Sequence, residues 1–301
     1  MIHIQVPATT ANLGPGFDIL GMALGLYNHI YMEERESGLK IEVSGEGSEN
    51  IPLDETNLAY QAMKRTLELT NKTLSGVYIK IHNEIPIERG LGSSAAVISG
   101  AIMATNILIG RPLNKKELLN LATQIEGHPD NVAAAIYGGI VASVVYEGKV
   151  ISRRLQPPAK FYAITFIPDI PLSTKKSREA LPKTINLEDA IFNMSRLSLL
   201  IAAFMNAERK LIGEMMEDRI HQPYRLKLIK GSEEIFKAAK ANGALSAVLS
   251  GAGSTLIAFS DEKNKEKIKN AMETEALKQN LPGIAKILLP VAGGAKEIKE
   301  K

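Results

Sequence analysis

The spacing of hydrophobic residues along the chain changes many times between the two-residue period of strands and the three-to-four-residue period of helices, and each change predicts a new element. Alternation predicts strands at 2–6, 27–34, 39–43, 77–83, 161–167, 244–249, 255–259 and 286–290, with a hairpin formed by 140–145 and 150–155. Spacings of three and four residues predict helices at 58–69, 94–109, 115–126, 131–137, 175–180, 187–209, 233–241 and 262–277. Residues 7–16 are predicted as a loop before an apolar stretch at 17–27. Helices and strands in both halves predict an α+β fold.

The middle of the chain contains the best candidate for a domain boundary. The chain has 301 residues, whereas a single hydrophobic core normally stops growing at about 250–300 residues. Residues 156–159 read Gln-Pro-Pro-Ala, and two prolines interrupt regular structure. We therefore predict an N-terminal domain at 1–156, a C-terminal domain at 157–301 and a cleft between them.

Composition excludes several classes of function. The 36 basic and 33 acidic side chains leave a net charge of only +3, which argues against a nucleic-acid partner. The chain contains no cysteine, so disulfides and thiolate chemistry are excluded, and a reducing compartment fits. The longest apolar run, 95–109, is too short and interrupted to cross a bilayer. We expect a cytoplasmic protein that binds small molecules, without a membrane partner.

The most informative motif lies at residues 85–95, which read Ile-Pro-Ile-Glu-Arg-Gly-Leu-Gly-Ser-Ser-Ala before an apolar helix. Glycines expose backbone N–H groups, and a helix N-terminus attracts anions, so the motif predicts a site for nucleotide phosphates. Its second half also matches the dinucleotide-binding fingerprint, but a polar, proline-containing octet separates it from the preceding strand. No Gly-Lys-Ser/Thr triplet occurs, which excludes the lysine-containing P-loop. Taken alone, the loop is explained equally well by a phosphate site and by a helix start whose small residues only permit close packing.

Four further clusters concentrate polar groups, and each has a simpler explanation. Residues 7–18 form a glycine-rich segment whose Asn and Asp either bind a ligand or bond to their own backbone. Residues 126–131 combine two carboxylates, an imidazole and an amide, and the second carboxylate can equally cap a helix. Arg178 and Arg225 suit a carboxylate ligand, although exposed arginines are usually surface charge. Residues 250–254 form a second glycine loop, which either closes over the phosphates or connects two strands.

Taken together, the segments 7–18, 86–96 and 250–255 resemble the three motifs of the GHMP small-molecule kinases, over nearly the whole chain. Three narrower blocks, Glu-Gly-His-Pro-Asp-Asn, Ser-Thr-Lys-Lys-Ser-Arg and Gln-Pro-Tyr-Arg, resemble the homoserine kinase branch of that family. The resemblance implies a two-domain α+β fold, in which an N-terminal ribosomal-protein-like α/β domain carries the ATP loop and the C-terminal domain is ferredoxin-like. It also implies ATP, Mg²⁺ and L-homoserine as the bound molecules.

The same resemblance implies roles for individual residues. ATP would contact Asn57, Leu58, Pro86, Ile87, Glu88, Arg89, Gly90, Leu91, Gly92, Ser93, Ser94, Ala95 and Ala96. The phosphate loop would be supported by Ser250, Gly251, Ala252 and Gly253. Mg²⁺ would be held by Ser94 and Glu126. Homoserine would contact Asn12, Asp18, His128, Asp130, Thr174, Arg178 and Arg225, with aspartates suited to its ammonium and arginines to its carboxylate.

Asn131 occupies the position at which mevalonate-type relatives carry an aspartate. Because an amide cannot accept a proton as a base, we expect Ser94, Glu126 and Asn131 to serve catalysis without a strong base. Positioning suffices where the phosphoryl-transfer transition state is loose. Two alternatives stay open: a family member that phosphorylates another alcohol, and a metabolite-binding relative that has lost transfer. A homodimer is one option for the oligomeric state.

Overall fold

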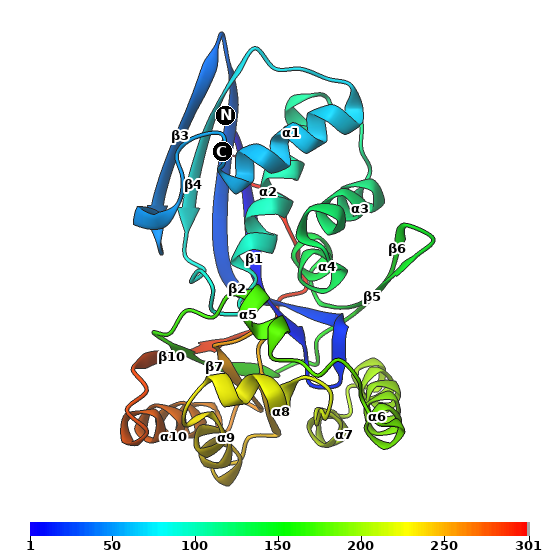
Figure 1. The fold of residues 1–301 in the computed structure, drawn as a ribbon, viewed down its shortest axis with the longest axis vertical. Coiled ribbons are helices and arrows are strands. Elements are labelled where there is room, and N and C mark those ends of the chain that lie inside the picture. Colours follow the sequence, from blue (N-terminus) through cyan, green and yellow to red (C-terminus); the bar gives the residue numbers. More distant parts are fainter. Residues whose placement is uncertain (300–301) are drawn as a thin grey trace.

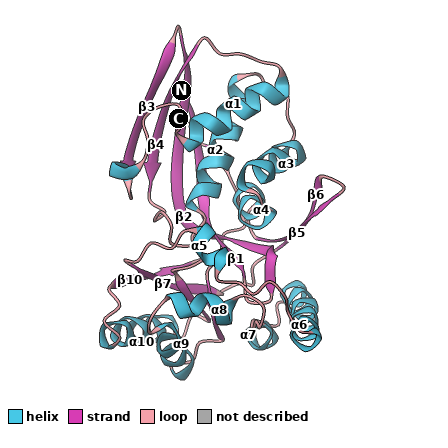
Figure 2. Ribbon diagram, viewed as in Figure 1, coloured by secondary structure: helices cyan, strands magenta, loops and turns pink. Residues whose placement is uncertain are grey.

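The computed structural model of the protein describes residues 1–299, which form two β-sheets with helices packed on them (Figures 1 and 2). The seven-stranded first sheet has the order β11-β1-β2-β4-β3, with β5 paired to β2 and β6 paired to β5. Its neighbours are antiparallel, except for the parallel pair β3 and β4. The bounds of its strands are β1 (Ile2–Asn12), β2 (Gly16–Arg35), β3 (Gly38–Gly45), β4 (Gly76–Asn83), β5 (Ile140–Tyr146), β6 (Lys149–Leu155) and β11 (Lys296–Glu297).

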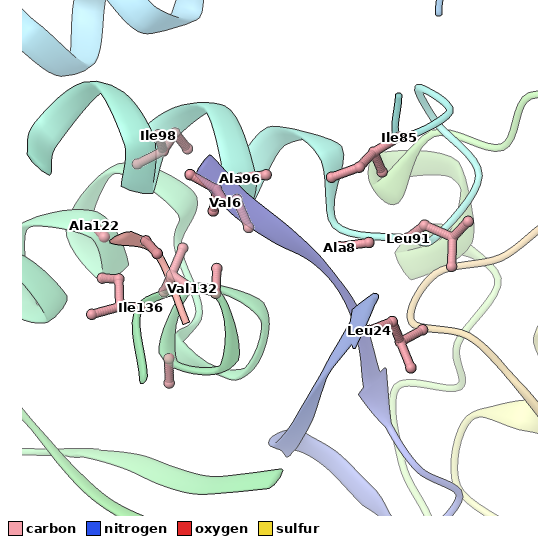
Figure 3. Close-up of a cluster of buried hydrophobic side chains, with 14 of the residues drawn as sticks. Val6, Ala8, Leu24, Ile85, Leu91, Ala96, Ile98, Ala122, Val132 and Ile136 are labelled. Carbon is pink, nitrogen blue, oxygen red and sulfur yellow. The ribbon is translucent and has the colours of Figure 1, made fainter. Parts of the chain in front are cut away.

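Four helices cover one face of this sheet (Figure 1). They are α1 (Leu58–Thr70), α2 (Ser93–Leu108), α3 (Lys115–Glu126) and α4 (Pro129–Tyr137), with the short 3-10 helix η1 (Ser48–Asn50) before them. The apolar sequence of α2 predicts burial on more than one side, and this is confirmed, because it packs against β1, β2, α1, α3 and α4. Figure 3 shows Ala96 and Ile98 of α2 beside Val6 of β1, with Val132 of α4 nearby. This packing fixes the N-terminus of α2 next to the first strand.

The second sheet has four antiparallel strands in the order β10-β7-β9-β8. Their bounds are β7 (Tyr162–Pro168), β8 (Ser246–Leu249), β9 (Leu256–Ser260) and β10 (Gly283–Leu288). The helices α9 (Ser232–Ala241) and α10 (Lys265–Lys278) pack on it around a core that includes Phe166, Leu256 and Met272. The connection from β7 to β8 contains α5 (Thr174–Glu179), α6 (Leu187–Asn206), α7 (Arg209–Met215), α8 (Gln222–Arg225) and η2 (Leu226–Leu228).

Two expectations about elements are wrong. Residues 7–16 are predicted as a loop, but β1 runs to Asn12 because it pairs with β2 from Ala8↔Leu24 to Asn12↔Gly16. The helix expected at 187–209 is present as α6 but ends at Asn206, since Ala207 adopts a left-handed conformation (φ 55°), and α7 then begins at Arg209 and extends beyond the expected end. The short elements α8 and β11 have no counterpart in the sequence-based assignment.

The predicted domain boundary at 156–159 lies in the connection between β6 and β7. The chain later returns to the first sheet, because β11 pairs with β1 (Ile4↔Glu297). The division at 156 stays a prediction. Within residues 1–299, no helix is both long and apolar enough to cross a membrane.

Candidate active site

The turn between β1 and β2 forms one wall of the site. Asn12 and Asp18 have left-handed backbones, with φ of 72° and 58°. The amide of Asn12 holds this shape, because its Oδ1 accepts from Asp18 N at 3.2 Å and its Nδ2 donates to Gly251 O at 3.0 Å. The second of these bonds joins residues 239 positions apart in the chain. Asn12 thereby connects the first strand to the second glycine loop.

The predicted phosphate loop, residues 90–94, lies between this turn and α2. Gly90 and Gly92 have φ of 74° and 69°, which few other residues adopt. A Cβ atom at Gly90 would overlap Ser250 O, and one at Gly92 would overlap Thr9 Oγ1. Ser250 Oγ donates to Gly90 O at 2.6 Å, so the second glycine loop supports the first from behind. The loop therefore enters α2 in a fixed conformation, with the positive end of a 16-residue helix behind it.

Ser94 and Glu126 meet at the start of α2. Ser94 Oγ lies 2.8 and 3.1 Å from the two carboxylate oxygens of Glu126, which ends α3. Burial raises the pKa of Glu126, although the hydrogen bond from Ser94 opposes this shift. A carboxylate in such a place is stabilised by a cation, and two hard oxygen donors suit Mg²⁺. The residues present fit the metal.

His128, Asp130 and Asn131 follow directly at the start of α4. Asp130 is buried, and its Oδ1 lies 3.0 Å from His128 Nδ1 and 2.7 Å from Asn131 N. Burial alone would lower the pKa of His128, but the hydrogen bond and charge of Asp130, aided by Glu126, raise it overall. Asn131 Oδ1 accepts from Thr9 Oγ1 at 2.9 Å, and its Nδ2 lies 3.3 Å from Asp130 Oδ1. The amide orientation is therefore defined on both sides.

Two arginines form the opposite wall. Arg178 makes a bidentate ion pair with Asp18, with N–O distances of 2.7 and 3.1 Å. Arg225 is almost fully buried and donates to Gly251 O at 3.0 Å and Ser177 O at 3.4 Å. Burial, followed by the charge of Arg178, lowers the pKa of Arg225 to about 10. Both guanidinium groups lie over the ring of Phe17, at 5.5 and 4.9 Å from its centroid. The wall is thus rich in positive charge and only partly neutralised.

Most of the predicted site residues line one cavity of about 240 Å³. They are Asn12, Asp18, Pro86, Ile87, Glu88, Arg89, Gly90, Leu91, Gly92, Ser93, Ser94, Glu126, His128, Asp130, Asn131, Thr174, Arg178, Arg225, Gly251, Ala252 and Gly253. Asn57 and Leu58 line a second cavity of about 730 Å³, which shares residues 86–89, 93 and 94 with the first. A small polar space and a larger adjoining one thus meet at the phosphate loop.

Three predicted residues line neither cavity. Ala95 and Ala96 are fully buried in α2, so their side chains pack in the core. Ser250 is also fully buried and acts through its bond to Gly90 O. Other lining residues were not singled out from the sequence: Ala11 and Leu172 in the first cavity, and Ile51, Pro52, Thr56, Val97 and Pro171 among those in the second. The available signal was adjacency to predicted residues, since Ala11 precedes Asn12, Thr56 precedes Asn57, Val97 follows Ala96 and Leu172 is two positions before Thr174.

The chain matches two family models, described as "GHMP kinases N terminal domain" at residues 57–139 and "GHMP kinases C terminal" at residues 200–279. The two-sheet fold with a glycine loop at the start of a buried helix, together with these matches, defines a GHMP kinase. The predicted two-domain α+β fold of that family is confirmed.

Similar proteins show to which branch of the GHMP kinases the chain belongs. A homoserine kinase from Moorella thermoacetica is 47% identical and covers 97% of this chain and 98% of its own length. A homoserine kinase from Desulfitobacterium hafniense is 40% identical and covers 99% of this chain and 100% of its own length. The crystal structure of homoserine kinase from Cytophaga hutchinsonii superposes with a TM-score of 0.89 at 32% identity, over 99% of this chain and 97% of that one. The chain belongs to the homoserine kinase family.

Proposed function

We propose that the protein transfers the γ-phosphoryl group of ATP to the side-chain hydroxyl of L-homoserine, giving O-phospho-L-homoserine and ADP, as a step of threonine biosynthesis. One observation carries this proposal: Arg178, Arg225, Asp18 and Asp130 line the same cavity as the phosphate loop. Charges of both signs beside a phosphate loop suit an acceptor that carries both an ammonium and a carboxylate. The names of the relatives point to the same acceptor.

The shape of the two cavities supports the placement of ATP. The nucleoside would occupy the larger cavity with Asn57 and Leu58, and the phosphates would lie along Gly90 to Ser94, which line the smaller cavity and of which Ser93 and Ser94 also line the larger one. Backbone N–H groups at the helix start and the helix dipole then face the phosphate charges. Ala95 and Ala96 contribute by packing this helix start and not by side-chain contact.

Ser94 and Glu126 would hold Mg²⁺ together with the phosphates. Residues 1–299 contain no group of three or more His, Cys, Asp or Glu side chains suited to a metal. Two protein ligands are nevertheless enough, because Mg²⁺ in kinases is usually held by one or two side chains and by substrate phosphates. When bound, Mg²⁺ supplies charge neutralisation on the transferred phosphoryl group.

The arrangement around Asn131 supports transfer without a strong base. Its Oδ1 accepts a hydrogen bond from Thr9 and its Nδ2 donates one to Asp130, so the second hydrogen of the NH₂ group is left for the acceptor hydroxyl. The hydrogen bond and charge of Asp130 raise the pKa of His128 against the effect of burial, which makes its imidazole easier to protonate and so less available as a base. Asn131 would orient the acceptor hydroxyl, and the loop N–H groups would stabilise the developing charge.

A substrate panel tests the acceptor. ADP release is followed by a coupled assay with L-homoserine, shikimate, mevalonate and galactose at fixed MgATP. We expect saturable turnover with homoserine. Saturation with only one of the other three would show a different GHMP kinase activity. ATP binding without turnover on any of the four would support the alternative of a metabolite-binding relative.

A further inference from the structure

Phe17 is the second residue of β2, between Gly16 and Asp18, in the turn that forms one wall of the site. It lines neither of the two cavities of the site. It nevertheless contacts both arginines that line the first cavity, because the guanidinium carbons of Arg178 and Arg225 lie 5.5 and 4.9 Å from the centroid of its ring. Any effect of Phe17 on the substrate must therefore pass through these two guanidinium groups.

The ring of Phe17 is held in a defined place by His221. The imidazole of His221 is fully buried and stacks on the ring, with 5.1 Å between the centroids and an interplanar angle of 23°. Its Nε2 donates to Gly14 O at 2.8 Å, so the same imidazole also binds the backbone of the turn. Burial lowers the pKa of His221, although the charge of Asp218 opposes this shift. His221 therefore supports the ring as a neutral group and adds no third positive charge.

Two guanidinium groups that bind one carboxylate must be held near each other, although they repel each other. The charge of Arg178 adds to the effect of burial in lowering the pKa of Arg225. A protein carboxylate between the two groups would remove the repulsion, but it would also occupy the place of a substrate carboxylate. An aromatic ring attracts cations through its quadrupole and carries no net charge. It can therefore hold both guanidinium groups and leave them able to bind an anion.

We propose that Phe17 is a positioning residue for the acceptor, whose ring holds Arg178 and Arg225 for the substrate carboxylate and so determines the affinity for the amino acid but not for ATP. Asp18 cannot replace the ring in this role. Its bidentate pair with Arg178 would be given up when Asp18 binds the substrate ammonium, whereas the ring contact would persist. The inference deepens the proposed function and rests on it, because it requires a carboxylate on the acceptor.

Steady-state kinetics of Phe17→Leu test this role. Leucine keeps an apolar side chain but removes the ring face, so KM for L-homoserine should rise by about 3- to 30-fold, the range covered by cation–π contacts. Because Phe17 lines neither cavity, kcat and KM for ATP should stay near the wild-type values. An effect on folding alone would not be confined to one KM.

Phe192→Leu is the matched control. The ring of Phe192 also lies against two arginines, with the guanidinium carbons of Arg196 and Arg219 at 3.2 and 3.8 Å from its centroid. None of these three residues lines either cavity of the site. The control therefore loses the same kind of contact at another place and should retain the wild-type KM for homoserine. An equal rise of this KM in both variants would overturn the proposal.

Pentafluorophenylalanine at position 17 separates the charge distribution of the ring from its shape. Fluorination reverses the quadrupole and nearly preserves the shape, so the melting temperature should be retained while KM for homoserine rises as in Phe17→Leu. This variant also serves if Phe17→Leu does not fold. A wild-type KM in the fluorinated protein would show that the ring acts only by packing and would overturn the proposal.

A double-mutant cycle tests whether the ring acts through the guanidinium groups. In the Arg178→Gln background, Phe17→Leu should lower kcat/KM for homoserine by a smaller factor, since one of its two partners is missing. Equal factors in both backgrounds would overturn the proposal. Failure of homoserine to saturate the wild type would refute the proposed function and this inference with it. Saturation of the wild type with an unchanged KM in Phe17→Leu would overturn the inference alone.

Discussion

Replacing Thr9 by valine should slow phosphoryl transfer while leaving the fold and both substrate affinities nearly unchanged. Thr9 is fully buried and lines neither cavity. Its Oγ1 donates to Asn131 Oδ1 at 2.9 Å, and its backbone N donates to Leu91 O at 3.0 Å. Valine has nearly the same shape and keeps the backbone bond, so the variant removes only the hydroxyl that sets the amide orientation of Asn131.

The size of the effect follows from the lost bond. Asn131 is only partly buried and lines the cavity, so the lost bond is worth about 0.5–1.5 kcal/mol, the net value of a typical hydrogen bond. If this cost falls on the transition state, kcat decreases by about 2- to 12-fold, since 1.4 kcal/mol corresponds to a factor of ten. The KM values for ATP and acceptor should change little, because Thr9 touches neither cavity. A loss confined to kcat distinguishes misorientation of Asn131 from a weakened binding site.

The assay is coupled ADP release at saturating MgATP and homoserine, with thermal unfolding measured in parallel. Thr9→Ser is the control, because serine retains a hydroxyl and should recover most of the wild-type kcat. Wild-type kcat in Thr9→Val would refute the role given to this hydrogen bond. A serine variant as slow as the valine variant would show that the methyl group, and not the hydroxyl, is what matters.

Three other substitutions give separate tests. Gly92→Ala should destabilise the protein by about 1–2 kcal/mol from the left-handed backbone alone and raise KM for ATP, because its Cβ would overlap Thr9 Oγ1; an unchanged melting temperature would contradict this. Glu126→Ala should abolish turnover while calorimetry still detects ATP binding, and full turnover in the variant would exclude the metal assignment. Because burial raises the pKa of Glu126, wild-type activity should rise with pH as this carboxyl ionises. His128 has a pKa that Asp130 raises overall against the effect of burial, so its stabilising contribution is present at low pH and is lost as pH rises through the folded-state pKa. The melting temperature of His128→Asn, measured against pH, should lack the decrease that this loss causes in the wild type. Parallel curves of melting temperature against pH for the variant and the wild type would argue against this contribution of His128.

The parts of the fold that depend on residues close together in the sequence could be predicted from the sequence. The glycine loop and α2 are one example, because Gly90, Gly92 and the apolar run after them are contiguous, and the backbone has φ above zero at both glycines. The capping of α3 is another: Asn114 accepts from Glu117 N while Glu117 accepts from Asn114 N. Such local signals give correct helix starts without knowledge of the tertiary structure.

The misassigned segment 7–16 shows where local signals fail. Its Thr, Asn, Gly and Pro residues are typical of a loop. Pairing with β2 supplies the backbone hydrogen bonds that such residues cannot obtain from their neighbours, and β1 continues to Asn12. Tertiary pairing therefore overrides composition. This extension is also what brings Thr9 to Asn131, a contact between residues 122 positions apart that no local pattern could indicate.

The Asp18–Arg178 ion pair shows how the site can discriminate among acceptors. The sequence predicts that they bind opposite ends of the substrate, yet here they bind each other, while buried Arg225 donates to the carbonyl oxygens of Gly251 and Ser177 and lies over the Phe17 ring. Its pKa is lowered to about 10 by burial and by Arg178, so positive charge in this wall is under-compensated. A substrate carboxylate between the guanidinium groups would relieve that repulsion, and a substrate ammonium would pair with Asp18 once Arg178 turned toward the carboxylate. A neutral sugar offers neither compensation, and for that reason we infer that selection of an amino acid rests on this wall and not on the phosphate loop.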